Sequence, residues 1–346
     1  MIREAITHVA AGALLSEAEA AAVMEEIMTG AATSSQMGAF LTALHLRPGH
    51  ETVEEIAGMA RVMREKAVHV HLDTRIANHA MDTCGTGGDG SGTFNVSTAA
   101  GIVAAAAGAS VAKHGNRSAT SRSGSADVLE SLGAKIDLGA EQVAACVQEV
   151  GFGFMFAPTF HPAMKHVGPT RREIGIRTVF NILGPLTNPA HTPYQVLGVA
   201  DGSSLRKMGE VLLRLGCQHA LIVHGEDGID ECSLSAPTHI CEVRKGKELC
   251  EYTITPEEVG LTRITDRQAF QGGDPAHNAA ILRELLSGYV DVPATHMLCL
   301  NAGAALLANE QVATLADGVK LARATLHEGK AKQKLSDVIA CTQSHG

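Results

Sequence analysis

Short apolar runs alternate with segments of helical pattern from about residue 73 onward, and this alternation restricts the fold more than any other feature of the sequence. The pattern is typical of a mostly parallel sheet with helices on both faces. We expect the strands at residues 80–83, 110–112, 153–156, 194–199, 220–223 and 251–254. Ligands of such sheets bind beyond the carboxyl ends of the strands. Because glycine-rich or polar segments directly follow three of these runs, we expect the functional site at that edge.

The first 66 residues show no strand pattern and contain three signals for helix starts. In each signal a Ser or Thr precedes a Glu or Gln by three positions, so the two residues can cap the first turn reciprocally. The three pairs are Ser16 with Glu19, Thr33 with Gln36, and Thr52 with Glu55. We therefore predict a small all-helical domain over residues 1–72 and a larger α/β domain over residues 73–346. Residues 165–190 are expected to return to the helical domain as a hinge, and helices from residue 274 onward to close the sheet.

The composition of the chain limits the cellular location and the binding partners that we expect. The 346 residues are 45% hydrophobic, enough for a large core, and carry a formal net charge of −9. No apolar run approaches the ~20 residues of a membrane span, and the N-terminus lacks a secretory signal pattern. Eight scattered cysteines without a CxxC pair, and histidines without HExxH spacing, predict reduced thiols and no transition metal. We expect a cytoplasmic protein with no membrane partner and, because it is acidic, no nucleic-acid partner.

The charge of the chain reverses locally between residues 82 and 127, where glycine and hydroxyl side chains are abundant. Residues 90–126 contain no carboxylate, while Lys113, Arg117 and Arg122 lie among serines and threonines. Lysine supplies a point charge, and hydroxyl groups supply adjustable donors to phosphate or sugar oxygens. The segment therefore predicts a site for a multiply phosphorylated small molecule, with a solvated polar loop as the alternative.

Five glycines lie in the loop of residues 85–93, between a strand candidate and a helix. Backbone N–H groups of such a loop, and of the helix start that follows, can approach phosphate oxygens. Gly85, Gly87 and Gly90 also fit the GxGxxG pattern of dinucleotide-binding proteins. That motif needs an acidic residue ~20 positions further on, and this chain offers Lys113 instead. No Gly-Lys-Ser/Thr sequence of a Walker loop occurs, so an ordinary surface loop is the remaining alternative.

Four carboxylates follow the apolar run at 220–223, within the sequence HGEDGIDE of residues 224–231. They repel one another unless a cation or solvent relieves them, and Mg²⁺ prefers carboxylates, water and substrate phosphate as ligands. We predict Asp230 and Glu231 as a metal-binding pair, with a plain acidic turn as the alternative.

Arg171, Arg172 and Arg177 form a basic patch in the predicted hinge segment. One guanidinium that faces the site can bind a substrate carboxylate through two parallel hydrogen bonds, which lysine cannot do. A solvated surface patch is the other interpretation.

Four segments resemble motifs of the anthranilate phosphoribosyltransferase family, in the same order. They are GTGGDGSGTFNVST, KHGNRSATSRSGSADVLE, HPAMK followed by RREIGIRTVFNILGPLTNPA, and HGEDGIDE. The resemblance covers nearly the whole chain and is weakest from Arg244 to Gly273. It implies a fold of the nucleoside phosphorylase and phosphoribosyltransferase type, a homodimer formed through the helical domain, and an active site in the hinge cleft between the two domains.

The resemblance also implies roles for individual residues. Phosphoribosyl diphosphate would be bound by Gly85, Gly88, Asp89, Thr93, Asn95, Val96, Ser97, Thr98, Lys113, His114, Gly115, Asn116, Arg117, Ser118, Ser121 and Ser125. Anthranilate would be bound by Gly85, Asn116 and Arg171, with His114, His161 and Pro185 as walls. Magnesium, the one expected cofactor, would be bound by Ser97, Asp230 and Glu231. Electrostatic and positioning roles are expected for Lys113, Asn116 and Arg171, and no nucleophilic side chain or general base is identified.

The implied reaction is transfer of a phosphoribosyl group to the amine of anthranilate, in tryptophan biosynthesis. One alternative is a pyrimidine nucleoside phosphorylase, which has a related architecture but uses phosphate as the nucleophile. The pair Asp230 and Glu231, together with the HGNR sequence of residues 114–117, favours the magnesium-dependent transferase. Another alternative is a non-catalytic relative that binds nucleic acid. The acidic net charge, and Arg171 beside intact acidic residues, argue against it.

Overall fold

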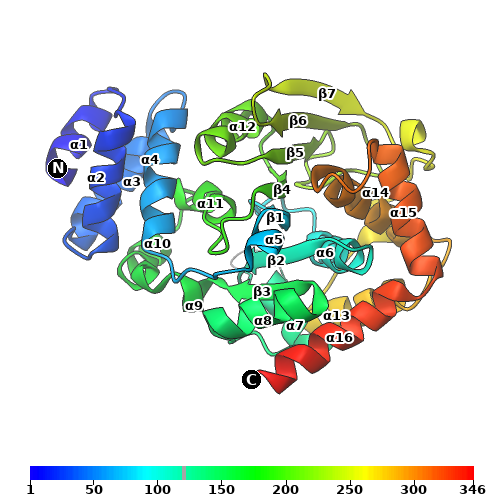
Figure 1. The fold of residues 1–346 in the computed structure, drawn as a ribbon. Helices are drawn as coiled ribbons and strands as arrows, with labels where there is room; N and C mark the ends of the chain where they lie inside the picture. Colours follow the sequence, from blue (N-terminus) through cyan, green and yellow to red (C-terminus); the bar gives the residue numbers. More distant parts are fainter. Residues whose placement is uncertain (119–121) are drawn as a thin grey trace.

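The computed structural model describes residues 1–118 and 122–346. The chain begins with a bundle of four helices, which forms a separate lobe at one side of the molecule (Figure 1). They are α1 (Ile2–Ala10), α2 (Glu17–Met28), α3 (Ser34–Leu46) and α4 (Val53–Glu65). The three predicted capping boxes are confirmed: Ser16, Thr33 and Thr52 each cap a helix and receive the reciprocal bond from the residue three positions later. The start signals in the sequence therefore set where α2, α3 and α4 begin.

A seven-stranded sheet forms the centre of the rest of the chain, in the order β3-β2-β1-β4-β5-β6-β7. The strands are β1 (Ala80–Gly85), β2 (Ser110–Gly115), β3 (Phe152–Phe156), β4 (Tyr194–Gly198), β5 (His219–Gly225), β6 (Thr238–Arg244) and β7 (Cys250–Ile254). The first five are parallel to one another, while β6 pairs antiparallel with both β5 and β7. All six predicted strands are confirmed, and β6 was missed.

The register of the sheet brings several strand ends together. Gly85 lies opposite Gly198, and Gly198 lies opposite Val223, so β1, β4 and β5 end at one edge. Gly115 likewise lies opposite Phe156, at the ends of β2 and β3. The loops that follow these strands are therefore neighbours in space, as is usual for the ligand-binding edge of a parallel sheet.

Helices cover both faces of the sheet (Figure 1). Apolar residues of α6, α14 and α16 pack with one another into one buried core, and α12 packs on β5 and β6 from a second core shared with the helical bundle. The helices after the bundle are α5 (Thr74–Ala77), α6 (Val96–Ala106), α7 (Ser125–Leu132), α8 (Ala140–Val150), α9 (Ala157–Phe160), α10 (Gly168–Ile174), α11 (Phe180–Leu183), α12 (Leu205–Arg214), α13 (Pro275–Leu286), α14 (Pro293–Ala308), α15 (Leu315–His327) and α16 (Lys330–Ser344). Short 3-10 helices are η1 (Pro162–His166), η2 (Gly184–Leu186), η3 (Gly202–Ser204), η4 (Glu257–Val259) and η5 (Arg267–Phe270).

The expected fold class is confirmed: a helical bundle is joined to a larger α/β part with a mostly parallel sheet. Within the segment 165–190, α10 packs against α3 of the bundle, and Val167 and Phe180 belong to the core that the bundle shares with α12. None of the helices in the two described ranges has the length and apolar character that a membrane span requires.

Candidate active site

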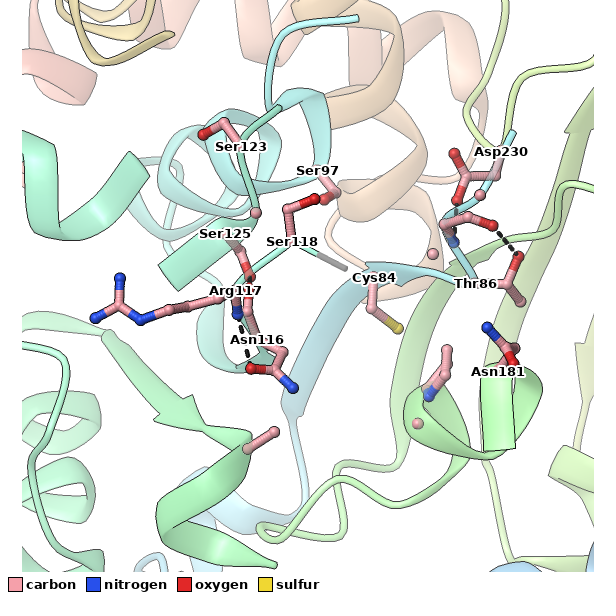
Figure 2. A pocket seen from close by; sticks show the side chains of 18 of the residues that line it. Cys84, Thr86, Ser97, Asn116, Arg117, Ser118, Ser123, Ser125, Asn181 and Asp230 are labelled. Atoms are coloured by element: carbon pink, nitrogen blue, oxygen red, sulfur yellow. Dashed lines mark hydrogen bonds between the residues drawn. The ribbon is translucent and has the colours of Figure 1, made fainter. Parts of the chain in front are cut away.

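A cavity of about 1210 Å³ lies beyond the carboxyl ends of β1 and β2, and α10 and the acidic segment 230–231 also line it (Figure 2). Every described residue of the predicted site lines this cavity. From the predicted phosphoribosyl diphosphate set these are Gly85, Gly88, Asp89, Thr93, Asn95, Val96, Ser97, Thr98, Lys113, His114, Gly115, Asn116, Arg117, Ser118 and Ser125. Arg171, His161, Pro185, Asp230 and Glu231 complete the set. Ser121 lies outside the described residues. The structure thus brings together residues that the sequence separates by more than a hundred positions.

The loop between β1 and α6 needs its glycines. Gly87, Gly88, Gly90 and Gly92 have φ values of 65°, 73°, 69° and 67°. Residues other than glycine rarely adopt these positive values. The backbone N–H of Gly87 donates to Asp230 Oδ2 at 2.7 Å. The loop is therefore fixed to the acidic segment by a hydrogen bond rather than left as a free surface loop.

Residues around Gln271 hold the far side of this loop, and the sequence analysis did not identify them. The Gln271 side chain donates to the carbonyl of Gly92 at 2.9 Å, and the N–H of Gly272 donates to the same carbonyl at 2.8 Å. Asn278, at the start of α13, donates to Asn95 Oδ1 at 2.9 Å. The signal in the sequence was the pair of glycines within QGGD, in the segment where the family resemblance was weakest.

Lys113 is the central cation of the site. Its side chain is only 2% exposed, and its ammonium group donates to the carbonyl of Thr83 and to Ser97 Oγ, the latter at 3.4 Å. Asp82 lies beneath it, fully buried, and burial raises the pKa of this carboxyl while the Lys113 charge acts in the opposite direction. Asn188 donates to Asp82 Oδ2 at 2.7 Å. The Asp82 carboxyl of β1 thus accepts from Asn188 and from the N–H of His114, while Thr83 and Ser97 hold the lysine at the cavity.

Three carboxyl groups, of Asp89, Asp230 and Glu231, lie near enough to influence one another at the acidic side of the cavity. Burial, and then the neighbouring Asp89 carboxylate, raise the pKa of Asp230 to about 7. Burial and Asp230 raise the pKa of Glu231 well above its usual range, although the charge of Lys113 opposes this. Glu231 Oε1 accepts from the N–H of Ser97 at 3.2 Å, and Asp89 Oδ2 is buried with no hydrogen-bond partner among the described residues. Clustered carboxyls with raised pKa values and an unpaired oxygen fit a site for a hard divalent cation.

Two histidine rings form an uncharged part of the cavity wall. The imidazole rings of His114 and His161 are 5.0 Å apart between centroids, and burial lowers their pKa values to about 3 and about 4. Both rings are therefore neutral at physiological pH. The guanidinium of Arg171 lies 5.3 Å from the centroid of the Phe180 ring, and burial lowers its pKa without any contribution from a carboxylate. A flat aromatic acid suits this combination of neutral rings and the guanidinium of Arg171.

Arg117 differs from the other predicted contacts, because its side chain points away from the centre of the pocket (Figure 2). Its guanidinium donates to Asp127 at 2.9 Å and to Glu130 at 2.8 Å. Asp127 also accepts from the N–H groups of Ser118 and Gly124, at 3.0 and 2.9 Å. The charge of Arg117 is thus balanced by α7, and the residue's side chain holds the shape of the loop after β2.

The architecture and the cavity define a class of protein. The sequence model described as Glycosyl transferase family, a/b domain, matches residues 77–332. A second model, Glycosyl transferase family, helical bundle domain, matches residues 3–67. The helical bundle and the α/β part are therefore the two characteristic parts of this class of transferases.

Relatives and solved structures narrow the class. An anthranilate phosphoribosyltransferase from Chloroflexus aggregans is 56% identical over 99% of this chain and 98% of its own. The crystal structure of anthranilate phosphoribosyltransferase from Thermus thermophilus is 46% identical, with a TM-score of 0.90 over 98% of this chain and 99% of that one. The enzyme from Saccharomyces cerevisiae in complex with PRPP and Mg is 28% identical, with a TM-score of 0.89 over 99% and 98% of the two chains. The chain belongs to the anthranilate phosphoribosyltransferase family.

Proposed function

We propose that this protein transfers the phosphoribosyl group of 5-phosphoribosyl 1-diphosphate to anthranilate, giving N-(5-phosphoribosyl)anthranilate and diphosphate in tryptophan biosynthesis. One observation carries the proposal: the glycine loop, Lys113 and the half-buried pair Asp230 and Glu231 line the same cavity as Arg171. In the reaction a bond forms between the anthranilate nitrogen and ribose C1, and the bond from C1 to the diphosphate oxygen breaks. The nitrogen loses one proton, and the diphosphate leaves with the bonding electron pair.

The glycine loop and the residues that start α6 are the proposed binding site of the diphosphate and the ribose phosphate. N–H groups of residues 87–98 and hydroxyls of Thr93, Ser97 and Thr98 supply donors, and Lys113 supplies a buried positive charge. Ser118 and Ser125 line the opposite side of the cavity, beside Asn116 (Figure 2). These donors are fixed before substrate arrives, because Asp230, Gln271 and Asp127 already hold the two loops.

Asp230 and Glu231, with the hydroxyl of Ser97, are the proposed ligands of magnesium. Bound there, the ion would neutralise negative charge on the leaving diphosphate. Mg²⁺ keeps several waters and takes substrate phosphate oxygens, so a few protein ligands are sufficient. The raised pKa values of these two carboxyls support the proposal, because a divalent ion bound there would displace the protons that the carboxyls retain.

Arg171 and Asn116 are the proposed contacts of anthranilate. Arg171 would bind the carboxylate through two hydrogen bonds, and the neutral rings of His114 and His161, with Pro185, would cover the aromatic face. This placement directs the amine toward ribose C1. Positioning and charge stabilisation then account for the catalysis without a nucleophilic side chain. The carboxylate of anthranilate itself is the proposed acceptor of the amine proton.

The proposal has a direct test. The chain contains no tryptophan, so the loss of anthranilate fluorescence can be followed with little protein background. Signal should fall only when phosphoribosyl diphosphate and magnesium are both present, and no loss with all three components would overturn the assignment. A double variant, Asp230→Asn with Glu231→Gln, should lose the magnesium-dependent rate. Phosphorolysis of a pyrimidine nucleoside, measured in parallel, should be absent.

We further propose a homodimer formed through the helical bundle. Leu14, after α1, and Leu46, at the end of α3, are 63% and 71% exposed. Exposed large apolar side chains on one domain are typical of a contact surface. Light scattering should give twice the chain mass, and Leu14→Glu with Leu46→Glu should shift the measured mass toward that of the monomer.

We place the enzyme in the cytoplasm, since all eight cysteines are free thiols. We also assign residues 165–190 as the hinge between residues 1–72 and 73–346.

A further inference from the structure

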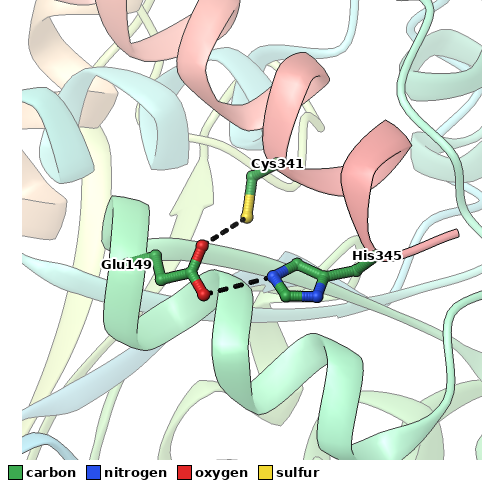
Figure 3. Close-up of side chains that lie close together, drawn as sticks. All are labelled: Glu149, Cys341 and His345. Atoms are coloured by element: carbon green, nitrogen blue, oxygen red, sulfur yellow. Dashed lines mark hydrogen bonds and ion pairs between the residues drawn. The ribbon is translucent and has the colours of Figure 1, made fainter.

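A cluster of metal-ligating side chains lies far from the cavity, where α16 packs on α8 (Figure 3). Cys341 and His345 come from the C-terminal helix and its cap, four positions apart, and therefore share one face. Glu149 comes from α8. One sulfur, one imidazole nitrogen and one carboxylate oxygen of these residues all lie within 4.8 Å of one another. Within the described ranges this is the one group of three or more such side chains so close together.

A second thiol, outside this group of three, lies beside that of Cys341. Cys146 of α8 has its sulfur 3.1 Å from that of Cys341. Gln142, Cys146 and Glu149 recur at spacings of four and three residues and so line one face of α8, and the Gln142 amide donates to the carbonyl of His345. The C-terminal turn is thus already fixed against α8, and it presents its thiol and imidazole to the thiol and carboxylate of that helix.

We propose that Cys146, Glu149, Cys341 and His345 form a binding site for a zinc ion that joins the C-terminal helix to α8. Two sulfurs, one nitrogen and one oxygen are a donor set that Zn²⁺ takes in tetrahedral sites. The hard cations Mg²⁺ and Ca²⁺ take oxygen ligands and do not compete for thiolates. The site is chemically distinct from the carboxylate and hydroxyl groups of the active site.

The distances between ligand atoms support a tetrahedral ion. With zinc bonds of about 2.3 Å to sulfur and about 2.0–2.2 Å to nitrogen and oxygen, ligand atoms of a tetrahedron lie about 3.3–3.8 Å apart. The Cys341 sulfur lies 3.7 Å from Glu149 Oε2, and His345 Nε2 lies 3.2 Å from Glu149 Oε1. The sulfur and the nitrogen thus contact different oxygens of one carboxylate, which has to turn to place a single oxygen on the ion. The two sulfurs, at 3.1 Å, need to separate by about half an ångström to reach the same range.

Burial is distributed as a structural ion site requires. Cys146 is 1% and Cys341 6% exposed, whereas the Glu149 side chain is 57% exposed and leaves a route for the ion. Cysteine binds zinc as the thiolate, whereas an ordinary thiol is mostly protonated at neutral pH. Binding therefore releases two thiol protons to water, and two thiolates and one carboxylate face the dication.

The sequence hides this site, because its ligands form two short motifs on helices almost two hundred positions apart. CxxE in α8 and CxxxH at the end of α16 match neither CxxC nor HExxH. The expectation of no transition metal relied on those local spacings. The proposed role is structural: α16 also packs against α6, whose first residues line the active site, so an ion that fixes α16 stabilises the layer behind the phosphate loop.

Cobalt spectroscopy on the full chain tests the proposal. Co²⁺ would be titrated into reduced, tag-free protein in a phosphine reductant, because cobalt thiolates give a charge-transfer band in the near ultraviolet that carboxylate sites lack. We expect the band at one equivalent, its loss on adding one equivalent of Zn²⁺, and a Tm that rises with zinc concentration. Cys341→Ser and His345→Ala should remove or greatly weaken the band and the rise in Tm. Cys250→Ser, at an exposed thiol outside the cluster, is the matched control and should retain both.

Several outcomes would overturn the proposal. One is an absent band in folded wild-type protein, and another is a band that persists in Cys341→Ser, which would place the metal at other thiols such as Cys84. If mass spectrometry of reductant-free protein finds Cys146 and Cys341 joined by a disulfide while the reduced protein binds no cobalt, the pair is a redox pair and not a metal site. Circular dichroism of each variant shows whether the loss of the cobalt band results from unfolding of the variant.

Discussion

A Cβ atom on Gly198 would lie 1.6 Å from the carbonyl oxygen of Asp230, closer than any two nonbonded atoms tolerate. Gly198 ends β4 and pairs with Gly85 of β1, where a Cβ would lie 2.4 Å from Asp230 Oδ2. Neither glycine has a positive φ, so their role is close approach and not backbone freedom. Two neighbouring strand ends without side chains thus allow the acidic segment 230–231 to reach the sheet edge.

Gly198→Ala should therefore displace Asp230 and impair magnesium-dependent turnover while the protein still folds. A shift of about 1 Å at a catalytic group lowers the rate on the order of 100-fold, so kcat/KM should fall by one to two orders of magnitude and more magnesium should be needed for half-maximal rate. Gly288→Ala, where a Cβ meets no atom within 4 Å, is the control and should behave as the wild type. A folded Gly198→Ala enzyme with unchanged magnesium dependence would show that Asp230 is not positioned this way.

Local patterns predicted the helix starts and the strand ends, because capping and hydrophobic periodicity act over a few residues. They did not predict β6, in which two consecutive buried residues, Ile240 and Cys241, break the period of two. They also missed Gln271, whose partner Gly92 is 179 positions away. Contacts of this kind depend on how the chain returns in three dimensions, and no short sequence window contains both partners.

The raised pKa of Asp230 predicts a pH dependence with a definite sign. Burial and Asp89 raise this pKa from 3.8 to about 7, so between these values the folded metal-free protein holds a proton that the unfolded chain has released. The stability of the metal-free protein should therefore fall as pH rises through this window. Magnesium displaces the same proton, so its affinity should increase up to about pH 7 and then level off.

Calorimetric titration of magnesium chloride in the presence of diphosphate, at pH values from about 5.5 to about 8, measures this dependence. Asp230→Asn should bind magnesium weakly at every pH and lose the slope. Glu226→Gln, at a half-exposed carboxylate four positions before Asp230, should keep the slope of the wild type. Equal affinity for magnesium at both ends of the range would contradict the assignment of Asp230 as a ligand.

Arg171 should set the affinity for anthranilate. Hydrogen bonds to a charged group contribute about 1.5–3 kcal/mol, so Arg171→Ala should raise the KM for anthranilate by about 10- to 100-fold and leave the KM for phosphoribosyl diphosphate nearly unchanged. Arg171→Lys should restore little, because an ammonium group cannot form two parallel bonds to a carboxylate. Arg75→Ala, at a side chain that is 94% exposed, controls for loss of charge. If only the KM for phosphoribosyl diphosphate changes, Arg171 binds that substrate and not anthranilate.

The helical bundle should depend on one buried ion pair. The side chains of Arg47 and Glu55 are 1% and 0% exposed, and Glu55 also accepts from the N–H groups of Leu15 at 2.9 Å and Thr52 at 2.8 Å. Removing one partner leaves the other charge buried, so Glu55→Ala should lower the free energy of unfolding by about 3–5 kcal/mol. Glu54→Ala, at the adjacent and 45% exposed carboxylate, should lower it by at most about 1 kcal/mol.

Urea unfolding followed by circular dichroism measures both variants, and pH supplies an independent check. Burial alone would raise the pKa of Glu55, but the bonds from Arg47, Leu15 and Thr52 outweigh it and the pKa is lowered. A lowered carboxyl pKa means that the pair stabilises the folded state fully above the usual value of 4.5 and that this stability is lost as pH falls further. The difference between wild type and Glu55→Ala should accordingly shrink in acid. If instead the difference in the free energy of unfolding stays constant down to about pH 3, the stability comes from packing of the Glu55 side chain and not from its charge.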